Sequence, residues 1–219
     1  KFKNELNHYL DLGTHILLAA HTGLYIMKEH GNEIFLEKYW SNDMQSPIEY
    51  IHQDLENKNI LWLGTRGDGL IELNTVTMKE KYWTVQEGLS NNYVHAIFED
   101  RLSRLWMSTD QNISCLDKQT GTFYTLTVDD GISTAEFNRN SFYQDTTNNV
   151  YYFGGIKGYN YFNPLDFNFK DPSTTNIRIL QLKLTNSKGK QRVIENIKNG
   201  DKIEVHESEN LIEIKLSTD

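Results

Sequence analysis

Seven polar side chains have the chemistry to bind a ligand rich in hydroxyl groups, and they fall in short stretches that also contain Gly, Asn or Asp. They are Arg66, Asp68, Asp110, Gln111, Glu136, Asn138 and Arg139. Guanidinium, carboxylate and amide groups are planar and can form paired hydrogen bonds with neighbouring hydroxyls. The same residue types also stabilise turns by themselves, so each position has a purely local interpretation beside the functional one. We treat the seven as candidate ligand-binding residues.

Catalysis is an alternative use of the acidic side chains. Asp129, Asp130 and Glu136 lie near one another in sequence, and paired carboxylates are the groups that hydrolyse glycosides. An acidic loop is more often simply solvated, and no Ser-His-Asp or Cys-His arrangement stands out. The seven histidines lack a His-Glu-x-x-His or paired spacing for a metal, and a single cysteine, Cys115, excludes a disulfide framework and a zinc cluster. The sequence therefore predicts no catalytic residue, no metal site and no cofactor.

The charge balance narrows the range of partners. The 219 residues include 22 Lys and Arg against 30 Asp and Glu, a formal net charge of −8. Non-specific nucleic-acid binding and a polybasic membrane patch both need an excess of basic residues, so we expect neither. No run approaches the ~18 consecutive apolar residues that span a bilayer. No basic-then-apolar leader follows Lys1, so either a leader was removed or the sequence is a piece of something longer.

An internal repeat organises most of the chain. Four apolar segments align, with central residues 45, 44 and 46 positions apart: Leu17, Trp62, Trp106 and Tyr152. An acidic residue precedes each segment: Asp11, Asp54, Asp100 and Asp145. Each repeat holds several short runs rich in β-branched and aromatic residues, bounded by Gly, Asn or Asp, and none shows a sustained helical apolar face. Four short strands every ~40–50 residues are typical of a β-propeller, so the predicted fold class is all-β.

The repeat also assigns structural roles. Trp62, Trp106 and Tyr152 are expected to bury large rings in the core between neighbouring blades. The repeated aspartate is expected to accept hydrogen bonds from its own loop backbone. In a propeller, the loops between strands two and three and the blade-to-blade connections gather on one face. That face would carry the seven candidate residues.

The number of blades is too small for an ordinary ring. Three complete blades are predicted at about residues 6–40, 48–84 and 93–127, with a shorter fourth at about 141–163. A ring needs roughly four to eight blades, and most rings of this kind have more than four, so the sequence reads as the C-terminal part of a larger propeller. Two chains that pair to close one ring are the alternative.

The end of the chain changes character. We assign residues 1–165 to the blades, 166–175 to a linker and 176–219 to a second domain. Within that domain, apolar and polar side chains alternate in three segments, residues 176–186, 203–205 and 211–216. Such alternation is typical of strands with one buried and one solvent-exposed face. They predict a β-sandwich that is incomplete at residue 219.

Several of these segments carry a resemblance to a known family. Residues 88–100 (GLSNNYVHAIFED) followed by 104–109 (RLWMST) resemble the two-component-regulator propeller repeat. Residues 136–138 with 152–164 resemble the last blade of such propellers. The segment from Ile177, with 209–214 (ENLIEI), is similar to the start of the triple-tyrosine Ig-like domain that follows them.

This resemblance implies a function that the repeat alone does not. Such propellers form the periplasmic sensor of hybrid two-component histidine kinases of Bacteroidetes, and they commonly detect oligosaccharides. By resemblance, the chain is the non-enzymatic ectodomain part of an inner-membrane protein that reaches the membrane only through segments outside this sequence. The Ig-like domain would pair two copies and relay ligand binding to a kinase.

Two other function classes stay open. A propeller enzyme that acts on polysaccharide, a lyase or a glycosidase, would use the carboxylates named above. A protein-interaction scaffold would resemble WD-repeat propellers, although this sequence lacks the Gly-His and Trp-Asp dipeptide motifs of those repeats.

Overall fold

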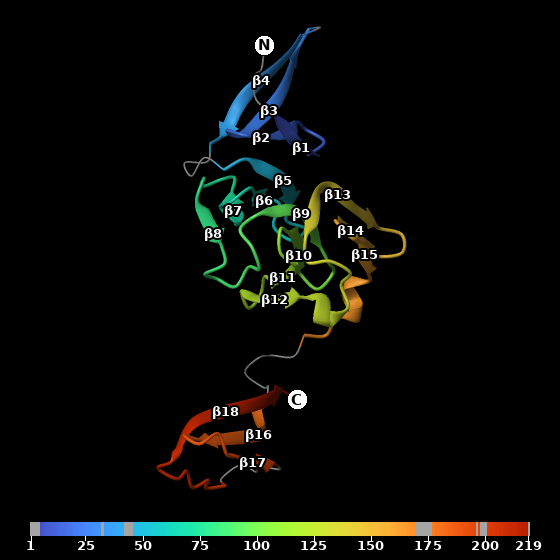
Figure 1. Cartoon of the computed structure of the whole chain (residues 1–219). Coiled ribbons are helices and arrows are strands. Elements are labelled where there is room, and N and C mark those ends of the chain that lie inside the picture. The colour runs from blue at the N-terminus through green and yellow to red at the C-terminus, as the bar shows by residue number, and fades with distance from the viewer. Residues whose placement is uncertain are drawn as a thin grey trace. The chain divides into compact units, whose positions relative to one another are not determined.

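The computed structural model describes residues 5–31, 33–41, 46–169, 177–195, 197 and 201–218. The chain divides into two compact units, residues 1–167 and 168–219 (Figure 1). Among the described residues, no helix is long and apolar enough to span a membrane.

The first unit contains three four-stranded antiparallel sheets, each with its strands in chain order. Blade 1 consists of β1 (Leu6–Asp11), β2 (Ile16–Ala20), β3 (Gly23–His30) and β4 (Glu33–Trp40). Blade 2 consists of β5 (Ile48–Gln53), β6 (Ile60–Thr65), β7 (Leu70–Asn74) and β8 (Glu80–Trp83). Blade 3 consists of β9 (Val94–Glu99), β10 (Arg104–Thr109), β11 (Ile113–Asp117) and β12 (Thr122–Leu126). The predicted all-β blades are confirmed.

The fourth sheet has three strands. Its members are β13 (Phe137–Asp145), β14 (Val150–Gly155) and β15 (Gly158–Phe162). One-turn 3₁₀ helices lie before and after it, η1 (Val128–Asp130) and η2 (Pro164–Asp166). The inner strand β13 begins at Phe137, four residues before the predicted start of this blade. The predicted linker begins at residue 166, whereas Phe167 still packs within the first unit.

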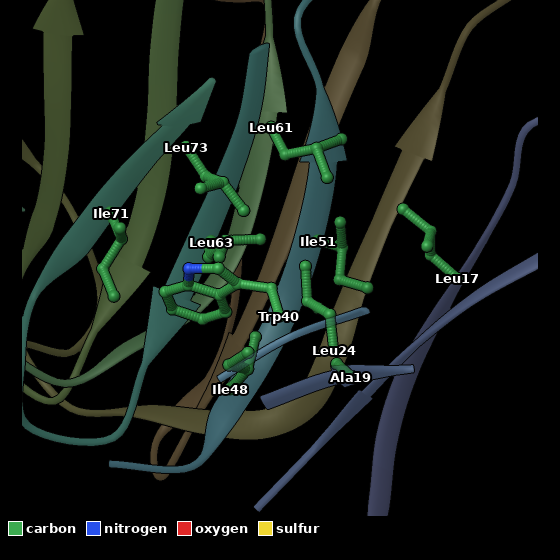
Figure 2. Close-up of a cluster of buried hydrophobic side chains, with 10 residues drawn as sticks. All are labelled: Leu17, Ala19, Leu24, Trp40, Ile48, Ile51, Leu61, Leu63, Ile71 and Leu73. Atoms are coloured by element: carbon green, nitrogen blue, oxygen red, sulfur yellow. The ribbon is translucent and has the colours of Figure 1, made fainter. Parts of the chain in front are cut away.

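Apolar side chains fill the spaces between blades. Figure 2 shows the cluster between blades 1 and 2, where Leu17 and Leu24 lie near Ile51 and Leu61, and the indole of Trp40 packs in the same cluster. A second cluster, which includes Trp62, joins blades 2 and 3. Each fully buried Leu or Ile contributes roughly 1.5–3 kcal/mol, so these interfaces hold the blades together.

The repeated aspartate organises the turn after each inner strand, as predicted. In all four blades its Oδ1 accepts main-chain N–H groups of its own turn, at 2.8–3.1 Å. In blades 2 and 3 the other oxygen has a further role that the sequence did not indicate. Oδ2 of Asp54 accepts from the indole of Trp62, and Oδ2 of Asp100 from that of Trp106, both at 2.8 Å.

The aromatic side chain of blade 4 that fills the core differs from the expected one. Trp62 and Trp106 are 4% and 0% exposed, but Tyr152 is only partly buried, whereas Tyr151 and Phe153 on either side are both 0% exposed. Strand residues alternate between the two faces of a sheet. In blades 2 and 3, the face that corresponds to that of Tyr152 is covered by the following blade. No described residue forms such a blade after β15, so the face stays open.

The second unit is a three-stranded antiparallel sheet in the order β17-β16-β18. Its strands are β16 (Ile177–Asn186), β17 (Gln191–Glu195) and β18 (Glu209–Thr218), and Leu182 and Leu184 are buried on the central strand. The predicted strand at 203–205 is wrong. The Glu204 carbonyl there accepts from the Arg192 side chain instead of joining the sheet. Residues 170–175 of the predicted linker and residue 176, the predicted start of the second domain, lie outside the described residues.

Candidate functional site

The same irregularity occurs in the inner strand of every blade. The pairing of β1, β5, β9 and β13 with the next strand shifts near the start of each inner strand. Asn7, Glu49 and His95 are the extra residues in the first three, and Arg139 lies in the longer bulge of β13. A β-bulge re-aims a side chain out of the regular alternation. Here the bulges direct four polar side chains, one from each blade, toward one cluster, which we call the axial cluster.

Glu49 is the centre of the axial cluster. It is 4% exposed, and its two oxygens accept from two arginines on different blades. Arg66 Nε donates to Oε1 at 2.6 Å, and Arg139 Nε donates to Oε2 at 2.7 Å. Arg139 Nη2 also donates to Asn7 Oδ1 at 3.0 Å. A buried carboxylate that is paired on both oxygens fixes the orientation of both guanidinium planes.

The position of Arg66 follows from its place at the start of the β6–β7 loop. Its main chain bridges to Tyr93, and its guanidinium carbon lies 5.8 Å from the centre of that ring. Burial works against the charged form, but the hydrogen bond and charge of Glu49 outweigh it and raise the pKa of Arg66. The Arg66 side chain stays 29% exposed, so its outer edge faces solvent while its inner edge is anchored.

His95 and Asp110 extend the axial cluster on blade 3. Nε2 of His95 lies 2.8 Å from Asp110 Oδ1, and the His95 ring lies 4.8 Å from that of Tyr93. Burial lowers the pKa of His95 more than the neighbouring carboxylate raises it, so the imidazole is neutral near pH 7 and donates from Nε2. Asp110 is 49% exposed and offers its remaining oxygen to solvent. This edge of the cluster supplies acceptors, whereas the arginines supply donors.

The structure brings three of the seven candidate residues into this cluster: Arg66, Asp110 and Arg139. The other four lie outside it. Asp68 accepts from the Ser46 main chain at 3.3 Å. The side chains of Gln111, Glu136 and Asn138 are exposed, with Asn138 in the bulged part of β13.

Sequence reasoning missed Asn7, Glu49 and Tyr93, and it assigned His95 no ligand role. The detectable signal was a polar residue at the second position of the inner strand in blades 1 to 3, directly after Leu6, Ile48 or Val94.

The expected gathering of loops at one end of the blades is seen in the main-chain hydrogen bonds. Gly67 and Gly69 of the β6–β7 loop both donate to the Asn92 carbonyl in the connection between blades 2 and 3. Asn112 of the next such loop donates to Ala135 in the connection that follows.

The carboxylate of Asp130, one of the candidate acids for catalysis, accepts from the main chain and hydroxyl of Thr127. These hydrogen bonds cap the turn that contains Asp130.

A second charged group lies at the other end of the blades. Lys118 of blade 3 donates to Asp54 of blade 2 at 2.6 Å and also to Glu99, whose second oxygen lies 2.8 Å from His52. Burial opposes the charges, but these hydrogen bonds lower the pKa values of Asp54 and Glu99 and raise that of Lys118. The group is fully paired and links two blades, so we assign it to the scaffold.

Comparison with known proteins agrees with this fold. Residues 88–111 match the family model of the two component regulator propeller. Over 65 residues the chain is 37% identical to histidine kinase P4 of Formosa agariphila. The aligned residues make up 28% of this chain and 5% of that protein. The expected resemblance to the sensors of Bacteroidetes histidine kinases is therefore confirmed.

Three solved structures share the architecture. The extracellular domain of the putative hybrid two component system BT3049 from B. thetaiotaomicron has a TM-score of 0.57 at 21% identity, covering 93% of this chain and 33% of that one. The corresponding domain of BT4673 from the same organism has a TM-score of 0.51 at 14% identity, covering 94% and 35%. PorZ, a component of the type-IX secretion system of Porphyromonas gingivalis, has a TM-score of 0.54 at 12% identity, covering 87% and 33%. The chain spans about a third of each solved chain. Residues 88–111 match the two component regulator propeller repeat, and the chain shares the fold of these three structures.

Proposed function

We propose that the chain is part of the extracytoplasmic sensor of a hybrid two-component histidine kinase and that it binds an oligosaccharide. The proposal rests on the propeller repeat at residues 88–111 and on the extracellular domains that share the fold. The observation that carries it is the axial cluster, because four separate blades contribute to one polar site beside the loop face.

The chemistry of the cluster suits a hydroxyl-rich ligand. Arg66 and Arg139 are held by Glu49, and about a third of each side chain is exposed. Because their orientation is already fixed, binding a ligand costs little side-chain entropy. Asp110 offers carboxylate oxygens on the other side. Paired donors next to acceptors match the vicinal hydroxyls of a sugar ring, and the Tyr93 ring supplies an apolar face.

The relay follows from the order of the two units. The first unit carries the candidate site, and the second would connect it to a membrane segment and pair with a second copy. A ligand could drive that relay only by binding one arrangement of the pair more tightly than the other. Periplasmic location and a kinase domain beyond this chain belong to the same proposal.

Calorimetric titration against a panel of plant and host oligosaccharides tests the proposal. We expect saturable binding by the chain or by a longer ectodomain that contains it. Arg139→Gln and Asp110→Asn should each weaken binding at least ~10-fold, which corresponds to ~1.4 kcal/mol. Arg101→Gln is the matched control, since Arg101 is an exposed arginine in the turn between β9 and β10. If only the longer ectodomain binds, and if neither substitution changes its affinity, the site lies outside the axial cluster. No binding by either would reject the proposal.

A further inference from the structure

The two arginines of the axial cluster carry more positive charge than their shared partner cancels. Nε of Arg66 and Nε of Arg139 donate to the two oxygens of Glu49, at 2.6 and 2.7 Å. Glu49 is 4% exposed, and each of its oxygens already accepts from one guanidinium. Two cations that share one buried anion leave one positive charge uncancelled. Because an arginine has donors and no acceptor, a ligand group that binds to this pair must accept hydrogen bonds.

A carboxylate of the chain itself already lies near this pair. Oε1 of Glu5 is 3.8 Å from Nη2 of Arg139, which is too long for a hydrogen bond. The Glu5 side chain is 68% exposed, so solvent screens this ion pair and the pair contributes little stability. Arg139 therefore attracts an exposed carboxylate without holding it firmly. A carboxylate that belongs to a ligand can take the place of Glu5 at little cost.

The acceptors of the axial cluster come from a different blade. Asp110 is 49% exposed, and one of its oxygens accepts from His95 Nε2 at 2.8 Å. Burial lowers the pKa of His95, so the imidazole is neutral near pH 7 and leaves the charge of Asp110 in place. The Tyr93 ring lies near both groups, with its centre 5.8 Å from the guanidinium carbon of Arg66 and 4.8 Å from the His95 ring. The cluster is therefore dipolar, with donors from blades 2 and 4 and acceptors from blade 3.

An uncharged layer of rings lies next to the axial cluster along the inner strands. One ring comes from each blade: His8, Tyr50, Phe98 and Phe142. The Tyr50 ring lies 4.0 Å from that of His8 and 5.1 Å from that of Phe142, and Tyr50 directly follows Glu49. Burial lowers the pKa of His8 to about 4 and raises that of Tyr50 to about 12, so both rings are uncharged near pH 7. Rings replace water on this side of the cluster, and charge-assisted hydrogen bonds are stronger where water is excluded.

A carboxylate matches the arginine pair better than a sugar hydroxyl does. A carboxylate only accepts, and a guanidinium binds it through paired charge-assisted hydrogen bonds that are roughly twice as strong as neutral ones. A hydroxyl can also accept, but its own O–H finds no acceptor on an arginine. Hydroxyls suit Asp110 instead, because a carboxylate accepts from them. A uronic acid combines both groups, with a carboxylate on one edge of the ring and hydroxyls on the opposite edge.

We propose that the axial cluster selects oligosaccharides that contain a uronic acid, with the sugar carboxylate on Arg66 and Arg139 and sugar hydroxyls on Asp110. This inference rests on the proposed function, since it names the class of oligosaccharide that the same site binds. Binding displaces Glu5 from Arg139. The formal net charge of −8 does not oppose an acidic ligand, because charges more than about 8 Å apart are largely screened at physiological ionic strength.

Matched pairs of oligosaccharides test this proposal by calorimetry, with the 219-residue chain and with the longer natural ectodomain. Oligogalacturonides, alginate oligosaccharides and glucuronoxylan oligosaccharides are each compared with the same preparation after its carboxyl groups are reduced to primary alcohols. The two members of a pair differ only in the group that the arginines bind. We expect at least one acidic preparation to bind, and its reduced form to bind at least ~10-fold more weakly.

Variants show which residues read the carboxylate. Arg139→Gln should bring the affinities of the acidic and reduced forms close to each other, whereas Arg101→Gln, at an exposed position outside the cluster, should keep the difference. Glu5→Gln removes the competing carboxylate, so it should tighten binding of the acidic form by ~2-fold and leave binding of the reduced form unchanged. Because Glu5 is exposed, its substitution leaves the fold intact.

Three outcomes overturn the proposal. Equal or tighter binding of the reduced forms would mean that the site prefers neutral sugars, and the proposed function would stand without this inference. An acid preference that is unchanged in Arg139→Gln would assign the carboxylate to another part of the protein. Absence of binding to the acidic preparations and to every neutral oligosaccharide of the wider panel would reject the proposed function and this inference together.

Discussion

Replacing Arg104 with methionine should strongly destabilise the first unit. Methionine keeps much of the length of the side chain but removes the charge and every donor. Asp100, whose side chain is 0% exposed, would lose the guanidinium that donates to it at 2.8 Å. The carbonyls of Pro164 and Phe167 would lose their donors at the same time.

The size of the effect follows from burial. Breaking a buried ion pair by removing one partner costs about 3–5 kcal/mol, because the remaining charge is left in a poorly solvated place. The two carbonyls add little if water reaches them. We therefore expect Arg104→Met to lower the free energy of unfolding by about 3–5 kcal/mol. Arg101→Met, at an exposed position three residues earlier, should change it by less than about 0.5 kcal/mol.

Urea denaturation followed by near-ultraviolet circular dichroism measures the first unit, because the buried aromatic rings lie there. Arg104→Met combined with Asp100→Asn should be less destabilising than the sum of the two single changes, since the double variant no longer buries an unpaired carboxylate. Amides of residues 165–169 should also exchange faster in Arg104→Met than in the native chain. A loss below about 1 kcal/mol, or strict additivity, would refute the assignment of Arg104 as a buried clamp.

Three further predictions use the same melts. Trp106→Ala should cost about 3–5 kcal/mol, because a fully buried ring is removed, and a loss below about 1 kcal/mol would contradict its place in the core. Arg66→Ala should cost about 1–3 kcal/mol, because it strips one partner from buried Glu49, and Arg66→Ala with Glu49→Gln should recover part of that loss. Burial and the nearby His52 lower the pKa of His8 from 6.5 to about 4, and Ile51 N–H donates to its Nδ1, so the folded state keeps His8 neutral. The unfolded chain then binds the proton first, so His8 should lower stability by about 2–3 kcal/mol as pH drops from 6.5 to 4. His8→Gln should reduce the pH-dependent loss by that amount, and an unchanged loss would contradict the interpretation.

Much of the architecture could be predicted, because it depends on short-range patterns that recur. The spacing of Trp62 and Trp106, with an aspartate before each, fixes both the blade period and the turn chemistry. The misplaced core residue of blade 4 shows the limit of that alignment. Tyr152 has the right position in the repeat, but burial depends on what lies next to the blade, and this neighbour is missing among the described residues. The wrong strand at 203–205 has a similar cause, because alternation does not reveal that Arg192 pairs with that segment.

The candidate site was only partly predictable, because it is assembled by bulges. Alternation assigns each residue of a regular strand to a face, and a bulge breaks that rule. Glu49 read as an ordinary polar strand residue, and only the register of β5 against β6 turns it inward. Arg139 was found because it lies near a loop, yet its partner on another blade, 90 residues earlier, could not be inferred from one sequence.

The two ends of the inner strands therefore serve different needs. At the end that leads into the turn, the four blades use the same residue, aspartate, because each must satisfy the main chain of the same turn. At the bulged end they use Asn7, Glu49, His95 and Arg139, which all lie in bulges but have no chemistry in common. A position that held the scaffold together would demand one residue type in every repeat, as the aspartate does. Because the bulge supplies its geometry from the backbone, the residue type can differ from blade to blade. We therefore expect substitutions at these four positions to change ligand binding mainly. Substitution of any of the four aspartates should mainly lower the stability of its blade.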